Sequence, residues 1–143
     1  MNSEQKIQTH ENQIRVTRNP SLVTSHYTPM RTHLDLDVWK KSIQFVKKIY
    51  EITSKFPDTE KYGLTNQMRR CAVSIPSNIA EGAGRNSKKE FKQFLYISLG
   101  SISEIETQLI ISTELSYLKD KSLLEELNEI RKMLFGLIKS IKI

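Results

Sequence analysis

Residues 66–85 read NQMRRCAVSIPSNIAEGAGR, a stretch rich in small side chains with a proline near its middle. At about 100° per residue, its main apolar side chains share one stripe of a helix: Met68, Ala72, Ile75, Ile79 and Ala83. Pro76 removes a backbone donor and crowds the preceding turn, so a kink is expected there. The small side chains allow a neighbouring backbone to come close. We therefore predict a kinked helix, ended by Gly82 and Gly84, at a close helix–helix contact.

Three further amphipathic helices are predicted around this stretch. Residues 38–54 form the first, with Asp37 as its N-cap and a core stripe of Trp39, Ile43, Val46, Ile49 and Tyr50. Another begins after Ser87, which forms a capping box with Glu90; its core side carries Phe91, Phe94, Leu95, Ser98, Ile102, Ile105 and Leu109. The last is capped by Asp120, and its stripe contains Leu123 or Leu124, Leu127, Ile130, Leu134, Leu137 or Ile138, and Ile141.

Four helices joined by short loops predict an all-α protein, an up-down-up-down antiparallel four-helix bundle over residues 35–143. Residues 1–34 are polar and lack periodicity, so we interpret them as a flexible N-terminal arm. The arm holds all the histidines, and their spacing is not that of a zinc site: His10, His26 and His33.

Most catalytic chemistry is excluded by the side chains that the predicted bundle lacks. With no histidine after His33, it has neither the Glu-x-x-His pairs of a di-iron bundle nor a histidine base. Glu104 and Glu106 diverge on a helix. We predict no enzymatic activity, cofactor, metal or small-molecule substrate. The single Cys71, interpreted as a small buried side chain, fits a reducing cytoplasm. No apolar run is long enough for a membrane span.

The chain has a net charge of +6, and within the predicted bundle the basic residues are concentrated at one end. In an up-down arrangement one pole collects Lys40, Lys41, Arg85, Lys88, Lys89, Lys92, Lys139 and Lys142. Such a surface suits phosphate backbones, because neutralising phosphates releases counterions. The alternative is ordinary solvated lysines on a structural or protein-interaction bundle with no nucleic-acid role. No aromatic side chains are interleaved with the basic ones, so any nucleic acid is expected to bind by shape and charge.

A second surface is predicted to mediate self-association. Three apolar residues lie well off the core stripe of their helix: Ile97, Ile111 and Leu115. Arg69 lies among apolar flank residues, where it would pair with an acidic residue at a subunit boundary or contact phosphate. These four residues form the predicted oligomer interface.

Several motifs match a known family in order and spacing. IPSNIAEGAGR followed by SKKEF, with LDVWKKS upstream and LGSISEIETQL downstream, resembles the four-helix-bundle family of 23S rRNA intervening-sequence proteins. That family is related to the accessory variability determinant proteins of diversity-generating retroelements. The resemblance runs from about Leu34 to Ile143. Its central motif carries Ile75, Pro76, Ser77, Asn78, Glu81 and Gly82.

This resemblance implies further expectations. Family members form a pentameric, barrel-like ring, so a homopentamer is expected. The expected partners are structured RNA or DNA, a ribonucleoprotein, or a reverse transcriptase, and the residues do not choose among them. Family members usually begin just before the LDVW-like motif, where Met30 stands here. An alternative start at Met30 is therefore one of two interpretations of the arm.

Overall fold

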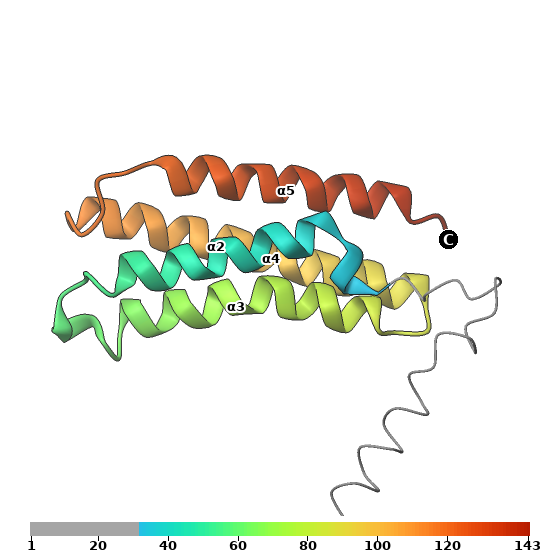
Figure 1. Cartoon of the computed structure of the whole chain (residues 1–143), viewed down its shortest axis with the longest axis horizontal. Coiled ribbons are helices and arrows are strands. Elements are labelled where there is room, and N and C mark those ends of the chain that lie inside the picture. The colour runs from blue at the N-terminus through green and yellow to red at the C-terminus, as the bar shows by residue number, and fades with distance from the viewer. Residues whose placement is uncertain (1–31) are drawn as a thin grey trace, which may run out of the picture. The chain divides into compact units, whose positions relative to one another are not determined.

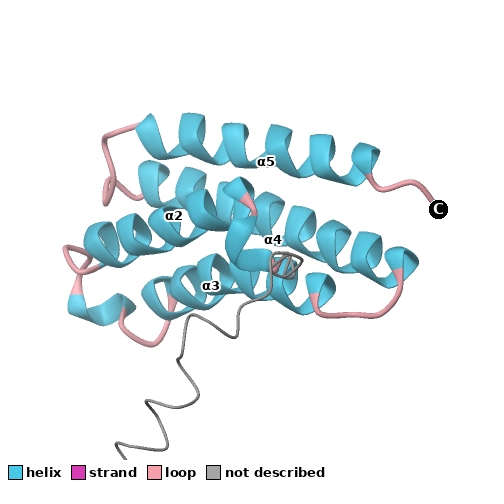
Figure 2. Cartoon of the chain, turned by 45° about the vertical axis from the view of Figure 1, so that its right-hand side comes forward, coloured by secondary structure: helices cyan, strands magenta, loops and turns pink. Residues whose placement is uncertain are grey.

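The computed structural model describes residues 32–143, and this part of the chain is helical with no strand (Figure 2). The predicted all-α class is confirmed. Most of the predicted arm lies outside the described residues, together with His10, His26 and the alternative start at Met30. The predictions made for those positions are not tested by the structure.

Four long helices lie side by side (Figure 1). They are α2 (Asp37–Thr53), α3 (Leu64–Ala83), α4 (Lys88–Glu114) and α5 (Ser122–Ser140), with short 3-10 helices η2 (His33–Asp35) and η3 (Asp58–Glu60) before α2 and α3. The backbone of α3 packs against α2 and α4, and that of α5 packs against α4 and α2. The starts of α2 and α4 and the ends of α3 and α5 lie at one end.

The chain enters α2 through η2 rather than through a capping aspartate. Thr32 caps η2, and its side chain and that of Asp35 form a reciprocal capping box. Leu36 then occupies the N-cap position of α2, where it makes no side-chain cap. The prediction that Asp37 caps this helix is therefore wrong, because Asp37 already lies in the first helical turn. Its carboxylate still carries the charge that a helix N-terminus favours.

The starts of α4 and α5 follow the predictions more closely. Ser87 is the N-cap of α4, and its hydroxyl accepts a hydrogen bond from the backbone N–H of Glu90 at 3.3 Å. Lys121, not Asp120, holds the N-cap position of α5. Asp120 nevertheless accepts a hydrogen bond from the backbone N–H of Ser122 at 2.8 Å. Hydrogen bonds from Ser122 also lower the pKa of the Asp120 carboxyl. Asp120 thus stabilises the helix start from one position earlier than expected.

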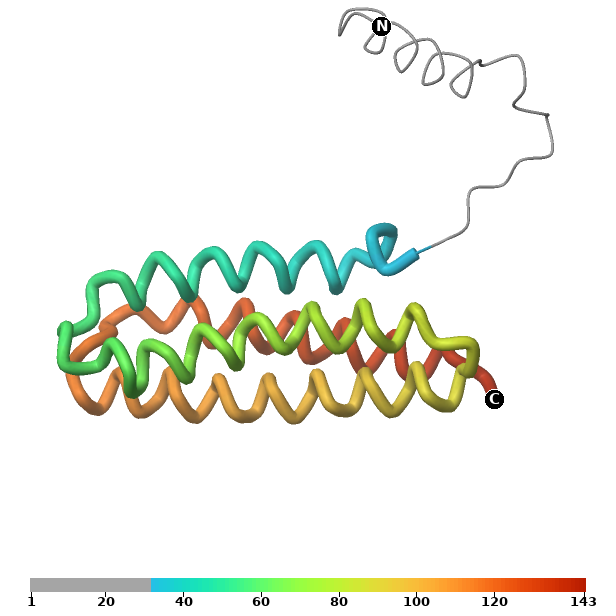
Figure 3. The backbone as a smooth tube through the Cα atoms, turned by 90° about the horizontal axis from the view of Figure 1, so that it is seen from below, coloured from blue at the N-terminus to red at the C-terminus, as the bar shows by residue number. Residues whose placement is uncertain are grey.

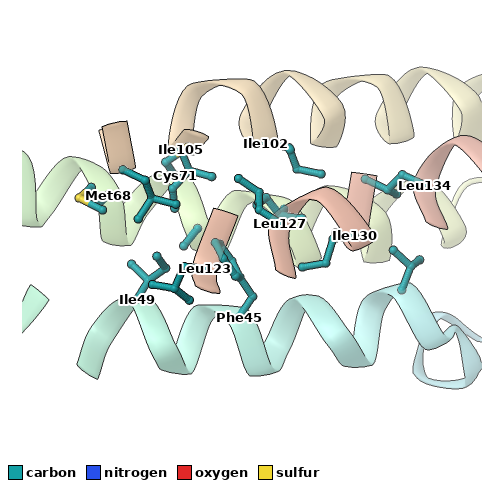
Figure 4. Packing of buried hydrophobic residues seen from close by; sticks show 14 of the residues in the cluster. Phe45, Ile49, Met68, Cys71, Ile102, Ile105, Leu123, Leu127, Ile130 and Leu134 are labelled. Carbon is teal, nitrogen blue, oxygen red and sulfur yellow. The ribbon is translucent and has the colours of Figure 1, made fainter. Parts of the chain in front are cut away.

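The core lies along the axis between the four helices, where side chains of all four meet (Figure 4). The largest fully buried side chains are Phe45, Ile49, Met68, Ile75, Ile79, Leu95, Ile102, Ile105, Leu109, Leu127, Ile130 and Leu134. The predicted stripes of α3, α4 and α5 supply most of them. On α5 the structure selects Leu123 over Leu124 and Ile138 over Leu137.

The predicted core stripe of α2 is right only in part: Ile49 is fully buried, and Trp39 and Val46 pack against the core. Ile43 and Tyr50, both assigned to the core, are 38% and 43% exposed. Besides Ile49, the buried face carries Phe45 and two small polar residues, Ser42 and Thr53, which were not predicted to be in the core. Their hydroxyls are accommodated because each donates to a carbonyl of its own helix at 2.7 Å. The face with the larger apolar side chains therefore points partly outward.

Helix α3 continues as one helix on both sides of Pro76, which is buried. It ends at Ala83, with Gly84 as its C-cap. Gly82 is buried inside the last turn, so its predicted role in ending the helix is wrong. The buried hydroxyl of Ser98 on α4 donates to the carbonyl of Ile75 at 3.0 Å, one residue before the proline. This bond attaches α4 to the motif where the proline interrupts the helical ladder.

Small side chains bring α3 and α4 close together, as predicted for this stretch; Figure 3 shows the two helices running alongside each other. A Cβ added at Gly82 would lie 2.6 Å from Cβ of Phe94 and 3.0 Å from the ring of Phe91. Further along, the hydroxyls of Ser74 and Ser101 are 2.7 Å apart and hydrogen-bonded. Hydrogen bonds between short side chains thus hold two backbones at a separation that larger residues would not permit.

Candidate nucleic-acid interface and exposed apolar faces

The predicted basic residues lie at the end of the bundle where α2 and α4 begin and α3 and α5 finish (Figure 1). We call them the basic pole: Lys40, Lys41, Arg85, Lys88, Lys89, Lys92, Lys139 and Lys142. The pole includes residues in the first two turns of both α2 and α4. Backbone N–H groups at the starts of α2 and α4 favour anions, whereas the C-terminal ends of α3 and α5 at the same pole carry the opposite partial charge. The lysine charges are therefore the main attraction for anions.

Two members of the basic pole are held by carboxylates. Lys41 forms an ion pair with Glu129 of α5, which lowers the pKa of the Glu129 carboxyl. Arg85 pairs with Glu81 at 2.9 Å, and its guanidinium lies 5.0 Å from the centre of the Phe94 ring. The other six pole residues make no ion pair within residues 32–143. The Glu129 partner was missed because it is distant in the sequence.

The remaining motif residues act mainly within the fold. Asn78 donates from Nδ2 to the backbone carbonyl of Ser74 at 2.8 Å. Ser77 is exposed between its neighbours on the outer side of α3. Glu81 is held by Arg85, four residues further along the helix. Asn78 and Glu81 therefore make contacts within the fold, whereas Ser77 is exposed on the side of α3 that faces α2.

Arg69 is held by uncharged groups of its own chain. Its Nε donates to the hydroxyl of Thr53 at 2.9 Å, and its guanidinium lies 4.6 Å from the centre of the Tyr50 ring. No carboxylate pairs with it within residues 32–143. These contacts account for an arginine among apolar neighbours, because stacking on an aromatic face and hydrogen bonds to the Thr53 hydroxyl and the Tyr50 carbonyl satisfy part of the guanidinium. Its place at a subunit boundary stays a prediction.

The apolar residues predicted to lie off the core of α4 are exposed: Ile97, Ile111 and Leu115. Ile97 is 51% exposed, although it lies within the third turn of the helix. Leu115 is the C-cap residue. Their part in an oligomer interface stays a prediction.

A second exposed apolar face, between α2 and α3, was missed by sequence reasoning. It contains a groove of about 290 Å³ lined by His33, Trp39, Ile43, Val46, Val73, Pro76, Ser77 and Ala80. The ring of His33 lies edge-on to that of Trp39, with 5.1 Å between ring centres. The predicted first helix has more large apolar residues than one core stripe needs, and this surplus indicated an apolar outer face. Sequence reasoning instead assigned the groove residues Trp39, Ile43 and Val46 to the core.

Cys71 lies beside a polar hollow between α3 and α4 and is buried. Its thiol donates to the backbone carbonyl of Ser101 at 3.1 Å. Burial, with the negative charge of Glu104 nearby, raises the pKa of the Cys71 thiol to about 12. The predicted burial of this side chain is confirmed.

The stability of the fold is expected to fall as the pH rises from about 9 toward about 12. The unfolded thiol, with its ordinary pKa of 9.0, loses its proton first, while the folded thiol keeps it until the pH nears 12. Ionisation therefore favours the unfolded state over this range. Denaturant unfolding at pH 8 and pH 10 measures the effect. A Cys71→Ala variant should lose less stability between these values, and an equal loss would contradict the assignment.

Comparison with known proteins identifies the family of this chain and a structural neighbour. The sequence model of the family described as 23S rRNA-intervening sequence protein matches residues 34–136. The chain belongs to this family. As a 23S rRNA-intervening sequence family member, it is similar in structure to a protein of unknown function from the S23 ribosomal protein family of Bacteroides thetaiotaomicron. The TM-score is 0.67 at 27% sequence identity, over 72% of this chain and 96% of the other.

A search of curated proteins finds no match to this family member. The family and the structural neighbour indicate no enzymatic family. Within residues 32–143, none of the helices combines the length and apolar character that crossing a membrane requires.

Proposed function

We propose that this family member is a non-catalytic homo-oligomer that binds nucleic acid, or a ribonucleoprotein, through the basic pole. The observation that carries the proposal is the gathering, at the end where α2 and α4 begin, of six lysines that make no ion pair within residues 32–143. Each lysine can neutralise a phosphate and release a counterion. The family's description, which names a 23S rRNA intervening sequence, supports RNA as the first nucleic acid to test.

The assembly we propose is a pentameric ring of up-down-up-down antiparallel bundles, acting in the cytoplasm. The alternating ends of α2–α5 support the topology (Figure 1), and the exposed apolar residues of α4 support self-association. A ring repeats the basic pole in every subunit, so weak phosphate contacts add through multivalency. A reverse transcriptase as partner rests on the family resemblance alone, and a reverse-transcriptase gene beside the coding sequence would favour it.

Reversing three lysines of the basic pole tests the proposal. We expect Lys88→Glu, Lys89→Glu and Lys92→Glu together to weaken binding to structured RNA of unrelated sequences alike. The slope of log affinity against log salt should flatten by about one unit for each phosphate that the variant no longer neutralises. Fluorescence anisotropy with labelled RNA over a salt series measures both quantities.

A matched control has the same charge change at the opposite end of the bundle. Lys55, Lys119 and Lys121 are exposed there, and their joint reversal to glutamate should leave the slope nearer that of the parent. Equal slopes for the parent and the basic-pole variant would remove the pole as the binding surface. That result would favour the alternative, a structural bundle whose surface lysines serve solubility.

A further inference from the structure

We propose that the polar hollow between α3 and α4 binds an unpaired guanine base of the nucleic acid that the basic pole attracts. This α3/α4 hollow has a volume of about 480 Å³, within the range of about 300–1,000 Å³ that is typical of sites for small organic molecules. The inference rests on the proposed nucleic-acid binding. It adds a preference for one base, which phosphate contacts from lysines do not supply.

Two opposite charges line the α3/α4 hollow without contacting each other. Arg70 extends from α3 and Glu104 from α4, and both side chains are exposed. Neither of them makes an ion pair within residues 32–143. The space between them can therefore receive a molecule that donates hydrogen bonds to the carboxylate and accepts them from the guanidinium.

The carboxylate of Glu104 is held by a buried amide. Nε2 of Gln108, one turn further along α4, donates to Oε1 of Glu104 at 3.4 Å. Gln108 is 5% exposed, and its own Oε1 has no hydrogen-bond partner within residues 32–143. The bond to Glu104 is thus the only one that this side chain makes there. A carboxylate has about four lone-pair positions, so both oxygens of Glu104 can still accept from a ligand.

Uncharged polar groups lie beside the two charges. Asn66 and Gln67 are exposed amides on the turn of α3 before Arg70, and they also line the hollow. Each amide can donate as well as accept. The buried lining residues Cys71 and Ser101 are already hydrogen-bonded within the fold, which leaves recognition to the exposed groups.

Guanine is the base whose hydrogen-bonding groups match this arrangement. Its N1–H and N2–H donors lie side by side and fit the two oxygens of one carboxylate. Its O6 and N7 acceptors follow on the same side of the ring, where the planar fork of Arg70 can donate to both.

The other bases fit the carboxylate less well. Adenine and cytosine present a ring nitrogen with a lone pair beside their amino group, and that lone pair would face the negative charge of Glu104. Uracil has a single N–H donor between two carbonyl groups. Because base pairing occupies the edge that Glu104 would contact, the guanine must be unpaired, as in a loop or a single strand.

The hollow lies within reach of the basic pole. Lys92 of the pole and Glu104 are separated along α4 by about 18 Å, at about 1.5 Å per residue. A short single-stranded segment can therefore contact the lysines with its phosphates and place one base in the hollow. In this arrangement the pole supplies affinity and the hollow supplies sequence preference.

Oligonucleotides that differ at one base test the inference. The probes are oligouridine RNAs of one length that carry a single guanosine, inosine or adenosine at their centre. We expect the full-length protein to bind the guanosine RNA about 5- to 100-fold more tightly than the adenosine RNA. The inosine RNA should lie in between, because inosine lacks the N2–H donor. Fluorescence anisotropy at one salt concentration measures the affinities.

Three substitutions separate the hollow from the rest of the surface. Glu104→Gln should bring the guanosine and adenosine affinities together, because an amide cannot accept from both donors of guanine. Arg70→Lys keeps the charge but lacks the planar fork, so it should reduce the preference and leave the salt slope unchanged. Glu114→Gln makes the same charge change at an exposed position at the end of α4, outside the hollow, and should keep the parent's preference. Circular dichroism should show the parent helicity in all three.

A nucleoside tests the hollow without the basic pole. Free guanosine carries no phosphate, so the lysines have no charge to neutralise on it. Saturation-transfer NMR should show contact between guanosine and the full-length parent and a weaker signal for adenosine. The guanosine signal should be lost in Glu104→Gln and kept in Glu114→Gln.

The outcomes distinguish this inference from the proposed function. Equal affinities of the parent for the guanosine and adenosine RNAs would overturn the hollow as a base site and leave binding by the basic pole standing. A preference that survives in Glu104→Gln, or the absence of a guanosine signal, would do the same; self-association that covers this side of α4 would produce the second result. Guanosine binding by a protein that binds no RNA would overturn the proposed function and leave the hollow as a nucleoside site.

Discussion

Replacing Phe45 with alanine is expected to lower the free energy of unfolding by about 3–5 kcal/mol. Phe45 is the largest fully buried side chain of α2 (Figure 4). Its removal forfeits the transfer free energy of the ring and leaves a cavity that the neighbouring helices fill only in part. Domains of this size are stable by about 5–15 kcal/mol, so the effect is a large share of the total. Urea unfolding followed by circular dichroism measures it.

Phe135→Ala is the matched control. Phe135 is exposed on α5, so the same truncation should change the free energy of unfolding by no more than about 0.5 kcal/mol. Both variants and the parent must be compared at one protein concentration, because self-association raises apparent stability by mass action. Equal effects at Phe45 and Phe135 would contradict the corrected core face of α2.

Gly82→Ala is expected to destabilise the protein by about 1–3 kcal/mol, although alanine is the better helix former. The added Cβ would lie 2.6 Å from Cβ of Phe94. Both atoms are fixed to their backbones, so α3 and α4 must separate to relieve the overlap. That separation also lengthens the hydrogen bonds between the two helices. Thermal unfolding of the variant measures the net effect.

Gly136→Ala is the same substitution at another position, and we expect it to stabilise the protein. A Cβ at Gly136, inside α5, would meet no atom within 4 Å. The substitution then acts only through the higher helix propensity of alanine compared with glycine, and the variant should be more stable by about 0.5–1 kcal/mol. A Gly82 variant more stable than the parent would show that packing between α3 and α4 is looser than the structure describes. A less stable Gly136 variant would show that the space beside Gly136 on α5 is not open.

The core stripes of α3, α4 and α5 could be predicted because each helix has one dominant row of apolar residues. Helix α2 has two. The row with Trp39, Ile43 and Tyr50 has larger apolar side chains than the row with Ser42 and Thr53. The hydrophobic pattern therefore favoured the row that is more exposed. The buried hydroxyls bond to carbonyls of their own helix, which lowers the cost of burial. The sequence pattern alone does not show that these hydrogen bonds offset the cost of burying the hydroxyls.

Other features depended on contacts between distant parts of the chain. The closeness of α3 and α4 was predictable from the small residues of the motif, but the specific role of Gly82 depends on Phe94, which belongs to the next helix. The basic pole could be predicted from topology, whereas the ion pair that holds Lys41 depends on the rotation of α5. Pairing of this kind follows from three-dimensional placement rather than from spacing.

The close α3–α4 pair also bears on how the chain folds. Its helices follow each other directly in the sequence, so their contacts close short loops and incur little loop entropy. Contacts between α2 and α5, by contrast, join the first and the last of the four helices, which are far apart in the sequence. Proteins reach their transition state fastest through local contacts, so the α3–α4 hairpin is placed to form early and to act as a template for the outer helices. During synthesis it would also emerge complete before α5 has been made.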